Sequence, residues 1–382
     1  MKKPNILLLV DRKHHSFFFN EISPTLTKHN NVEIIETAEF HKYTTNNYKP
    51  TNPELEKVVN YYYKKKISRT TLLRWIKFLR HIFRHYLMFV AKNYFNNYCR
   101  YFENKKIDCI GVWSGNAIPL AAAIVAARRT NIKTVFFENG ALPNTTAMDT
   151  KGINFQNSVP RDPDFYLSLS VPHNYNEPKS QLIKRESKKI IKDTPVKLPD
   201  NYLFIPFQVF GDSQIILFSP WIDKMELLTE LVIRARDEAG QNLWLVFKEH
   251  PTCKNDYSVF KKRLKSPNVL FANGNSTQEL IENSQGVITI NSSVGIESLL
   301  LGKKVITLGQ AFYNIEGLVL HADNFQELIE CIKKVQTWNF DNNLKNSFLS
   351  YLDEYYIKGS WREPTAKTIE IINKRFDTIL MN

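Results

Sequence analysis

The sequence predicts an α/β protein of two domains, each built on a parallel, doubly wound sheet. The chain has 382 residues, which exceeds one ordinary domain and suits two domains of about 150 to 200 residues. Short apolar runs alternate with helix-length segments in both halves, as is typical of parallel sheets. A polar stretch at 173–200, rich in Lys, Ser, Asn and Pro, separates the halves.

The first domain is expected over 1–172. Its strands are predicted from runs of Val, Ile, Leu, Phe and Trp bounded by polar residues. These runs lie at 5–10, 32–35, 108–113 and 133–137, and an Ala-rich helix is expected at 118–129.

The second domain is expected over 201–382, after the linker. Strands are predicted at 202–207, 243–248, 269–271, 286–290 and 304–308, and helices at 220–239, 276–284 and 293–301. Both domains therefore have the Rossmann-like rhythm, in which ligands bind at the carboxyl ends of the strands.

Composition favours a folded, cytoplasmic protein. Hydrophobic residues make up 43% of the chain and charged residues 23%. The apolar run near the start is shorter than the core of a signal peptide, and no run reaches the roughly 18 residues that span a bilayer. Cys99, Cys109, Cys253 and Cys331 show no metal-binding spacing, so we expect reduced thiols and no zinc site.

The formal charge of +13 is concentrated in a basic helical insertion at 64–106, with twelve Lys or Arg against one Glu. One or two amphipathic helices at this position suit an anionic membrane surface, and hence the inner face of the cytoplasmic membrane. Aromatics packed on the first domain with solvated cations explain the pattern equally well. No nucleic-acid module accompanies it, so no nucleic-acid partner is expected. The interleaved aromatics are Trp75, Phe78, Phe83, Tyr86, Phe89, Tyr94 and Phe95.

Two carboxylates follow predicted strands. Glu138, in the segment Glu138-Asn139-Gly140, can serve as an acid or base in a cleft, and it can equally cap a helix. Asp212, in the segment Gln208-Val-Phe-Gly-Asp-Ser-Gln214-Ile, is by spacing first a helix N-cap, and second a nucleophile or base.

Two further segments, each at the end of a predicted strand, have residues that can bind an anion. Lys248 and His250, followed by Pro251, can bind a phosphate or carboxylate, although a lone His is usually structural. The segment Asn291-Ser-Ser-Val-Gly295-Ile-Glu297 offers hydroxyls and free backbone N–H groups where a helix begins, so we favour phosphate binding by Ser292 and Ser293 over simple capping.

An aromatic loop, Gly309 to Asn314, follows the next strand. Phe312 and Tyr313 can pack on a base or sugar, but packing in the core is the better interpretation. Asp162-Pro-Asp164 imitates a metal-binding D-x-D motif in a proline-containing loop, and we expect no catalytic metal and no cofactor.

Together these segments, with Asn157-Ser-Val-Pro-Arg161-Asp-Pro-Asp-Phe-Tyr, resemble the capsule polysaccharide synthesis family over 112–318. The likeness is to its retaining β-Kdo transferases, which act in capsule initiation or terminate O-antigen chains of lipopolysaccharide. It implies the GT-B architecture, with the active site in the cleft between two Rossmann-like domains.

The resemblance also implies a CMP-Kdo donor, a lipid or glycan acceptor, and double displacement through Asp212 with Glu138 as acid/base. The donor-binding residues would be Gln208, Lys248, His250, Pro251, Asn291, Ser292, Ser293, Gly295 and Glu297. Further contacts to donor or acceptor are expected from Asn139, Gly140, Asn157, Arg161, Gln214, Phe312 and Tyr313. This chain departs from capsule-initiating members at Glu249 and Ala141. The resemblance therefore does not identify the acceptor.

Two other functions fit the sequence. One is a GT-B transferase that uses another donor, such as a UDP-sugar or CDP-glycerol. The other is a non-catalytic component of a polysaccharide assembly complex, although Asp212, Glu138 and His250 together argue against it.

Overall fold

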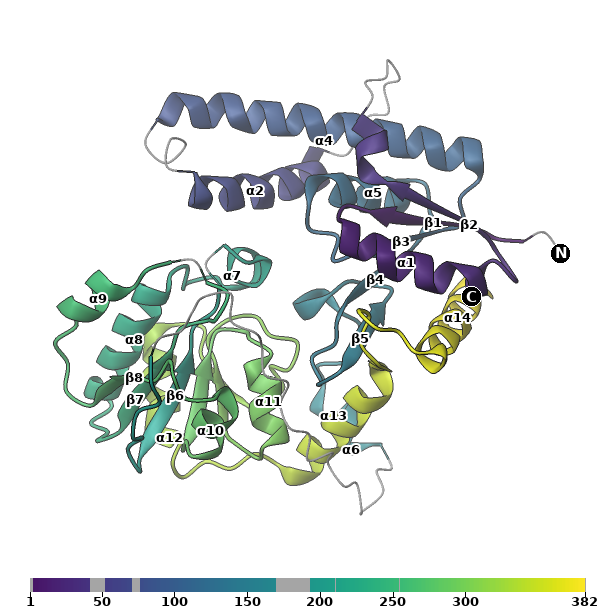
Figure 1. The fold of residues 1–382 in the computed structure, drawn as a ribbon. Coiled ribbons are helices and arrows are strands. Elements are labelled where there is room, and N and C mark those ends of the chain that lie inside the picture. The colour runs from purple at the N-terminus through teal and green to yellow at the C-terminus, as the bar shows by residue number, and fades with distance from the viewer. Residues whose placement is uncertain are drawn as a thin grey trace. The chain divides into compact units, whose positions relative to one another are not determined.

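The computed structural model describes residues 3–41, 52–70, 76–169, 193–209, 211–253 and 255–381. The chain divides into two compact units (Figure 1). The first unit contains 1–140, 144–158 and 355–382, and the second contains 141–143 and 159–354. Each unit has its own six-stranded sheet, which confirms the predicted α/β class with two Rossmann-like domains.

The first sheet has the order β12-β5-β4-β3-β1-β2. Strands β2, β1, β3 and β4 pair in parallel, and β5 pairs antiparallel with both β4 and β12, so β5 alone runs in the opposite direction. Its strands are β1 Asn5–Val10, β2 Asn31–Glu36, β3 Cys109–Trp113, β4 Lys133–Asn139, β5 Thr145–Asp149 and β12 Ile357–Lys358.

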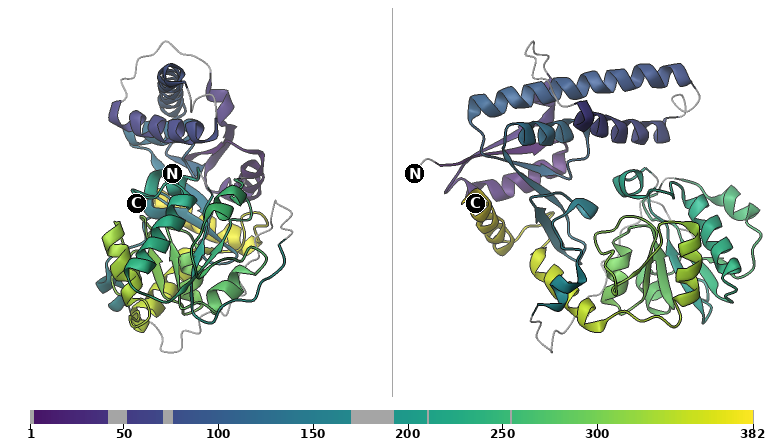
Figure 2. Two further views of the ribbon diagram at one scale, coloured as in Figure 1. Left: turned by 90° about the vertical axis from the view of Figure 1, so that its left-hand side faces the viewer. Right: turned by 180° about the vertical axis from the view of Figure 1, so that it is seen from behind.

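Helices cover both faces of this sheet, as Figure 1 and the rear view in Figure 2 show. Leu7 and Leu9 of β1 point into a core shared with α2, α4 and α5, whereas Leu8 points into a core with α1 and α14. Because successive side chains of a strand alternate between faces, a strand buried on both sides reads as one apolar run. The elements are α1 Lys13–Leu26, η1 Thr37–His41, α2 Asn52–Arg69, α4 Lys77–Lys105, α5 Ile118–Arg129, η2 Asn154–Gln156 and α14 Ala366–Met381.

The predicted basic insertion is helical where it is described. It includes part of α2 and all of α4, while 71–75, with Trp75, lies outside the described residues. Tyr94 and Phe95 are buried in the first unit's core, whereas Phe78 and Phe89 are exposed. Phe83 is partly buried against the same core. Core packing therefore explains only one side of α4 and leaves Phe78 and Phe89 unexplained. Among the described residues, no helix is long and apolar enough to span a membrane.

The second sheet is entirely parallel, with the order β11-β10-β9-β6-β7-β8. In sequence order this is the 3-2-1-4-5-6 arrangement of dinucleotide-binding folds. Its strands are β6 Tyr202–Pro206, β7 Trp244–Lys248, β8 Val269–Phe271, β9 Gly286–Thr289, β10 Val305–Thr307 and β11 Leu320–His321.

Helices α8 and α12 pack on one face of this sheet, and α10 and α11 pack on the other. The helices of the unit are α6 Pro163–Leu167, α7 Ser213–Phe218, α8 Met225–Glu238, α9 Ser258–Arg263, α10 Thr277–Glu282, α11 Val294–Leu300, α12 Phe325–Lys334 and α13 Asn342–Tyr355.

The division of the chain differs from the predicted 1–172 and 201–382. Residues 355–382 return to the first unit, where Ile357 pairs with Thr146 and Phe376 of α14 is buried with Phe137. Residues 159–169 belong to the second unit, where Tyr166 lies 5.3 Å from Phe348 between ring centroids. Helix α14 was not predicted, and its amphipathic pattern does not indicate the sheet on which it packs. Most of the expected linker, 173–192, lies outside the described residues.

Candidate functional site

The predicted loops of the second unit gather at one edge of its sheet. Strands β6 and β9 are neighbours, with β7 and β8 beyond β6 and β10 and β11 beyond β9. This is the point at which strand order reverses, where ligands bind in doubly wound folds. Each loop follows the carboxyl end of a parallel strand: 208–215 follows β6, 248–251 ends β7, 291–297 follows β9, and 309–314 follows β10. The expected strand ends are confirmed.

Gln208 and Asn291 join the β6 and β9 loops directly. The Gln208 amide donates to Asn291 Oδ1 over 2.9 Å, and the Asn291 backbone N–H donates to Gln208 Oε1 over 3.2 Å. Asn291 Nδ2 donates to the carbonyls of Gln214 and Phe218 over 3.0 and 3.1 Å. Both side chains are buried. Their amides are thus occupied in holding the loops, which gives these two predicted donor-binding residues a positioning role.

Asp212 is the N-cap of α7, so the interpretation that spacing favours is confirmed. Gly211 has φ +78°, a left-handed conformation that suits glycine and turns the chain into the helix. The backbone N–H of Gln214 donates to Asp212 Oδ1 over 3.4 Å, and the Ser213 hydroxyl donates to the same oxygen over 3.1 Å. Among the described residues, none donates to Oδ2. The residue as a whole is exposed.

Lys248 is directed at the loop after β8. Its ammonium donates to the carbonyl of Asn273 over 2.8 Å and to that of Asn275. Glu249 forms a partly buried ion pair with Lys261, with 2.7 Å between Oε1 and Nζ. Lys248 therefore braces the neighbouring loop as well as ending β7.

His250 has a defined hydrogen-bond pattern. Its Nδ1 accepts the backbone N–H of Thr252 over 3.2 Å and lies 3.0 Å from the Thr252 hydroxyl. Because a backbone N–H can only donate, Nδ1 carries no proton, and the neutral ring carries its hydrogen on Nε2. The imidazole, which Pro251 follows, is half-buried.

The start of α11 differs from the expectation of free backbone N–H groups. Ser292 N–H donates to Thr289 Oγ1, Val294 N–H to Ser292 Oγ, and Gly295 N–H to the Ser292 carbonyl. The expectation is wrong for these three groups, because the turn satisfies them internally. Ser293 begins the helix without a side-chain cap bond, and Glu297 is half-buried in the first turn.

Gly295 makes room for Tyr313. A Cβ atom at Gly295 would stand 2.3 Å from the Tyr313 hydroxyl oxygen, which donates to the Ser292 carbonyl over 2.5 Å. Tyr313 is 1% exposed and Phe312 is 7% exposed. Core packing, the better interpretation of this aromatic loop, is confirmed.

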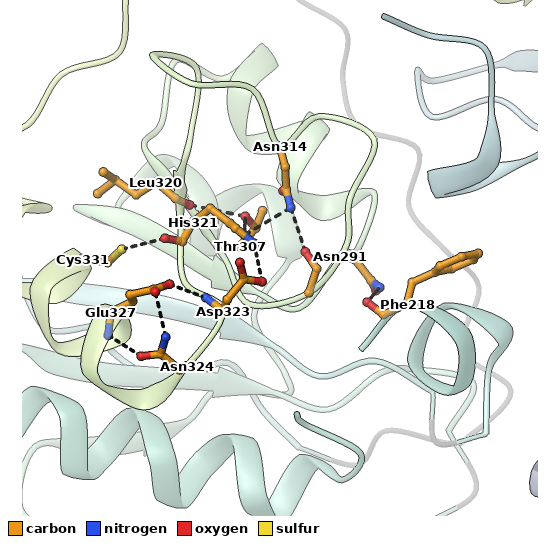
Figure 3. Close-up of polar contacts among 11 residues, drawn as sticks. Phe218, Asn291, Thr307, Asn314, Leu320, His321, Asp323, Asn324, Glu327 and Cys331 are labelled. Atoms are coloured by element: carbon orange, nitrogen blue, oxygen red, sulfur yellow. Dashed lines mark hydrogen bonds and ion pairs between the residues drawn. The ribbon is translucent and has the colours of Figure 1, made fainter. Parts of the chain in front are cut away.

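The loop after β10 continues into a polar network that Figure 3 shows. Asn314 Nδ2 donates to the Gly309 carbonyl over 2.9 Å and lies 3.1 Å from His321 Nδ1. His321 also lies 2.8 Å from the Thr307 hydroxyl and, through Nε2, 3.0 Å from Asp323. Asn314 and His321 also line a cavity of about 400 Å³, together with Gly317, Lys334 and Trp338. This network was not predicted, because β11 has only two residues and its sequence has no strand pattern.

Glu138 lies in the first unit, on β4 opposite Ala147 of β5. Its Oε1 accepts the backbone and side-chain N–H groups of Asn139, both over 3.0 Å. Asn139 Oδ1 in turn accepts the indole N–H of Trp361 over 2.7 Å. Gly140 is required by the hairpin, since a Cβ there would stand 1.9 Å from Thr145 Oγ1. Glu138 is therefore on a strand and does not cap a helix.

Asp149 ends β5 and binds Ser158 of the predicted segment 157–166. Its Oδ1 accepts the backbone N–H groups of Lys151 and Gly152, and its Oδ2 accepts those of Ser158, the Ser158 hydroxyl and the Tyr355 hydroxyl, at 2.5 to 2.9 Å. Burial acts to raise the pKa of Asp149, but the bonds from Ser158 and Tyr355 outweigh it and hold the pKa below its ordinary value.

Two predicted contacts, Asn157 and Arg161, lie on either side of Ser158 in the chain. Asn157 is buried, and Arg161 donates through Nη1 to the carbonyl of Val159. Asp162 caps α6 by accepting the N–H of Asp164 over 3.0 Å. The D-x-D imitation is thus a helix start. Among the described residues, no group of three His, Cys, Asp or Glu side chains is placed to hold a metal ion.

The family described as "Capsule polysaccharide biosynthesis protein" matches residues 179–354, which lie within the second unit. Protein FixF of Sinorhizobium fredii is 41% identical over 264 residues, covering 69% of this chain and 63% of that protein. Capsule polysaccharide export protein KpsS of Escherichia coli is 26% identical over 250 residues, covering 50% and 64%. The chain thus spans less than two thirds of these relatives. Among solved structures, the β-Kdo 2,7 transferase KpsC of Thermosulfurimonas dismutans aligns with 85% of this chain and 88% of that chain, at 14% identity and a TM-score of 0.46.

Proposed function

We propose that this chain, whose segment 179–354 belongs to the capsule polysaccharide biosynthesis family, is a glycosyltransferase that transfers Kdo from CMP-Kdo during assembly of a capsule or lipopolysaccharide. The observation that carries the proposal is the exposed Asp212 carboxylate at the β6/β9 switch point, beside the loops that hold His250 and Ser292. The resemblance of these segments to retaining β-Kdo transferases supplies the donor.

The donor anions would be bound by the loops after β7 and β9. A CMP-sugar carries a phosphate and Kdo adds a carboxylate, so the site needs hydrogen-bond donors that favour negative charge. In this proposal the donors would be the Nε2–H of His250 and the hydroxyls of Ser292 and Ser293. Gln208, Asn291 and Lys248 would hold these loops in place through the bonds described above.

Asp212 would act as the nucleophile. Its free oxygen forms a bond to the anomeric carbon of Kdo while the bond from that carbon to the phosphate oxygen breaks, and CMP leaves with the electron pair. An acceptor hydroxyl then attacks the same carbon, and Asp212 leaves as a carboxylate. The acceptor proton passes to a base, for which Glu138 is the candidate. Two displacements preserve the β configuration.

Paired variants test the role of Asp212. Asp212→Asn should keep the α7 cap, because Asn is as good an N-cap as Asp, but it removes the nucleophile. We expect transfer from CMP-Kdo to fall by about 10³-fold or more. Asp162→Asn is a matched control, since Asp162 is also an exposed N-cap that accepts an N–H two residues on. The assay compares lipid and glycan acceptors, and transfer by Asp212→Asn at the wild-type rate contradicts the mechanism.

A nucleotide panel tests the donor. CMP should raise the melting temperature of the wild-type chain, whereas UDP at the same concentration should not. A larger shift with UDP would indicate a UDP-sugar enzyme. A chain that binds CMP but never releases it from CMP-Kdo, with either acceptor, would be a non-catalytic component.

A further inference from the structure

Helix α4 is apolar on two opposite faces. One face is buried in the core of the first unit through Leu87, Ala91, Phe95, Tyr98 and Phe102. The other carries large apolar side chains in solvent: Phe78 is 71% exposed, Ile82 49%, Tyr86 54% and Phe89 52%. Burial in this unit accounts for the first face only.

The exposed side chains form one continuous line, which we call the α4 stripe: Phe78, Ile82, Tyr86 and Phe89. Their spacings of four, four and three residues place them on one side of the helix. At 1.5 Å per residue the stripe is about 16 Å long. The same side continues with Asn93, Asn96 and Arg100, so it turns polar where the helix enters the second half. The stripe is therefore confined to the first half of α4.

Positive charge surrounds the stripe. No Asp or Glu occurs between Glu56 and Glu103, whereas eleven Lys or Arg do. Lys77 and Lys92 of α4 are exposed, and neither forms an ion pair with any residue that the structure describes. Arg84 links α4 to Asn60 of α2, and Lys64 and Lys66 of α2 are also exposed.

We propose that the α4 stripe binds the surface of an anionic phospholipid bilayer, with the helix lying in the headgroup region. Phe78, Ile82 and Phe89 insert between the lipids, and Tyr86 places its ring at the boundary with water. The flanking cations bind the lipid phosphates. This surface is independent of the proposed donor and of the reaction at Asp212.

The dimensions of the stripe favour lipid over a protein partner. A stable protein interface buries roughly 1,000 Å² or more. A line one side chain wide and about 16 Å long falls short of that area but suits shallow insertion into a headgroup layer. The sequence from 57 to 102 carries Lys and Arg but no Asp or Glu, which complements the negative charge of an anionic headgroup layer.

Flotation of the full chain with vesicles tests this proposal. The probes are vesicles of phosphatidylcholine alone and vesicles containing about one third phosphatidylglycerol, at about 0.1 M salt. We expect the wild type to float with the anionic vesicles only. The triple variant F78S/I82S/F89S should bind at least about tenfold more weakly. The double variant K77E/K92E should also bind more weakly, by an amount that shrinks as salt rises.

Matched changes in the second unit serve as controls. Val259→Ser removes an apolar side chain that is 58% exposed, and K262E/K265E reverses two exposed charges. Both should bind like the wild type, and all variants should keep the wild-type melting temperature and nucleotide binding. The proposal is overturned if the wild type does not float, or if the triple variant floats as the wild type does. It is also overturned if the triple variant changes only the oligomeric state, which would make the stripe an interface between copies.

Discussion

Two aspartates that follow strands, Asp149 in the first unit and Asp212 in the second, have opposite surroundings. Asp149 is 4% exposed, and five hydrogen bonds occupy both of its oxygens. Asp212 is exposed, and its two bonds both reach Oδ1. One carboxylate has both oxygens bonded within the fold, whereas no described residue donates to Oδ2 of the other. The number and placement of donors, and not the residue type, separate the two roles.

The largest effect on stability is expected from Asp149→Ala. The chain leaves the first unit after Ser158 and returns at Tyr355, and both residues are bound to this carboxylate. Removing it leaves several buried donors unpaired, which should cost about 3 kcal/mol in the free energy of unfolding. Urea unfolding measures this loss. A cost below that of Asp162→Ala, an exposed cap variant, would contradict the assigned role.

Asp149 also predicts a pH dependence. Its pKa in the folded chain lies below the ordinary value of 3.8. Its stabilisation is therefore fully present above that ordinary value and is lost as pH falls through the lowered one. Wild type should lose more unfolding free energy between pH 6 and 3 than Asp149→Asn does. Equal losses in the two proteins would show that other carboxylates dominate this range.

Gly295→Ala should have an intermediate effect. The new Cβ collides with the buried ring of Tyr313, and overpacking of this kind costs about 2 kcal/mol. In a Tyr313→Val background the same change should cost little, because the ring is gone. Urea unfolding of the wild type, the two single variants and the double variant gives the coupling free energy between positions 295 and 313. An equal cost in both backgrounds would mean that Gly295 serves another purpose.

The smallest effect on stability is expected from Asp212→Ala. Loss of an exposed cap costs about 1 kcal/mol, which leaves the chain folded at room temperature. The same variant should lose transfer activity. Together with Asp149→Ala, it separates a catalytic carboxylate from a structural one. A cost as large as that of Asp149→Ala would remove the distinction.

The sequence predicted those parts of the fold that depend on local pattern. Strand β1 is a plain apolar run, and α5 is an Ala-rich helix whose bounds match the expectation. The strand-end loops follow from the same runs, because parallel strands end at one edge of the sheet. The cap at Asp212 follows from a glycine, an acidic residue and a serine in succession.

What the sequence did not predict depends on contacts between distant residues. Asp149 and Tyr355 are 206 positions apart, and Asn139 and Trp361 are 222 apart. The bond between Gln208 and Asn291 requires β6 and β9 to be neighbours in the sheet. The local hydrophobic pattern of a strand does not predict which strands are its neighbours. The N–H groups at α11 were expected to be free because their partners, such as Thr289 Oγ1, arise from a turn geometry with no sequence signature.

The central claim, that Asp212 forms a bond to the transferred sugar, is tested most directly by mass spectrometry. The chain is incubated with CMP-Kdo without acceptor, denatured and cut with trypsin, which releases the peptide 198–224 around Asp212. We predict that this peptide gains the mass of one Kdo residue, that fragmentation places it on Asp212, and that Asp212→Asn shows no adduct. An unmodified peptide from enzyme that still releases CMP, or an adduct that persists in Asp212→Asn, would contradict the account.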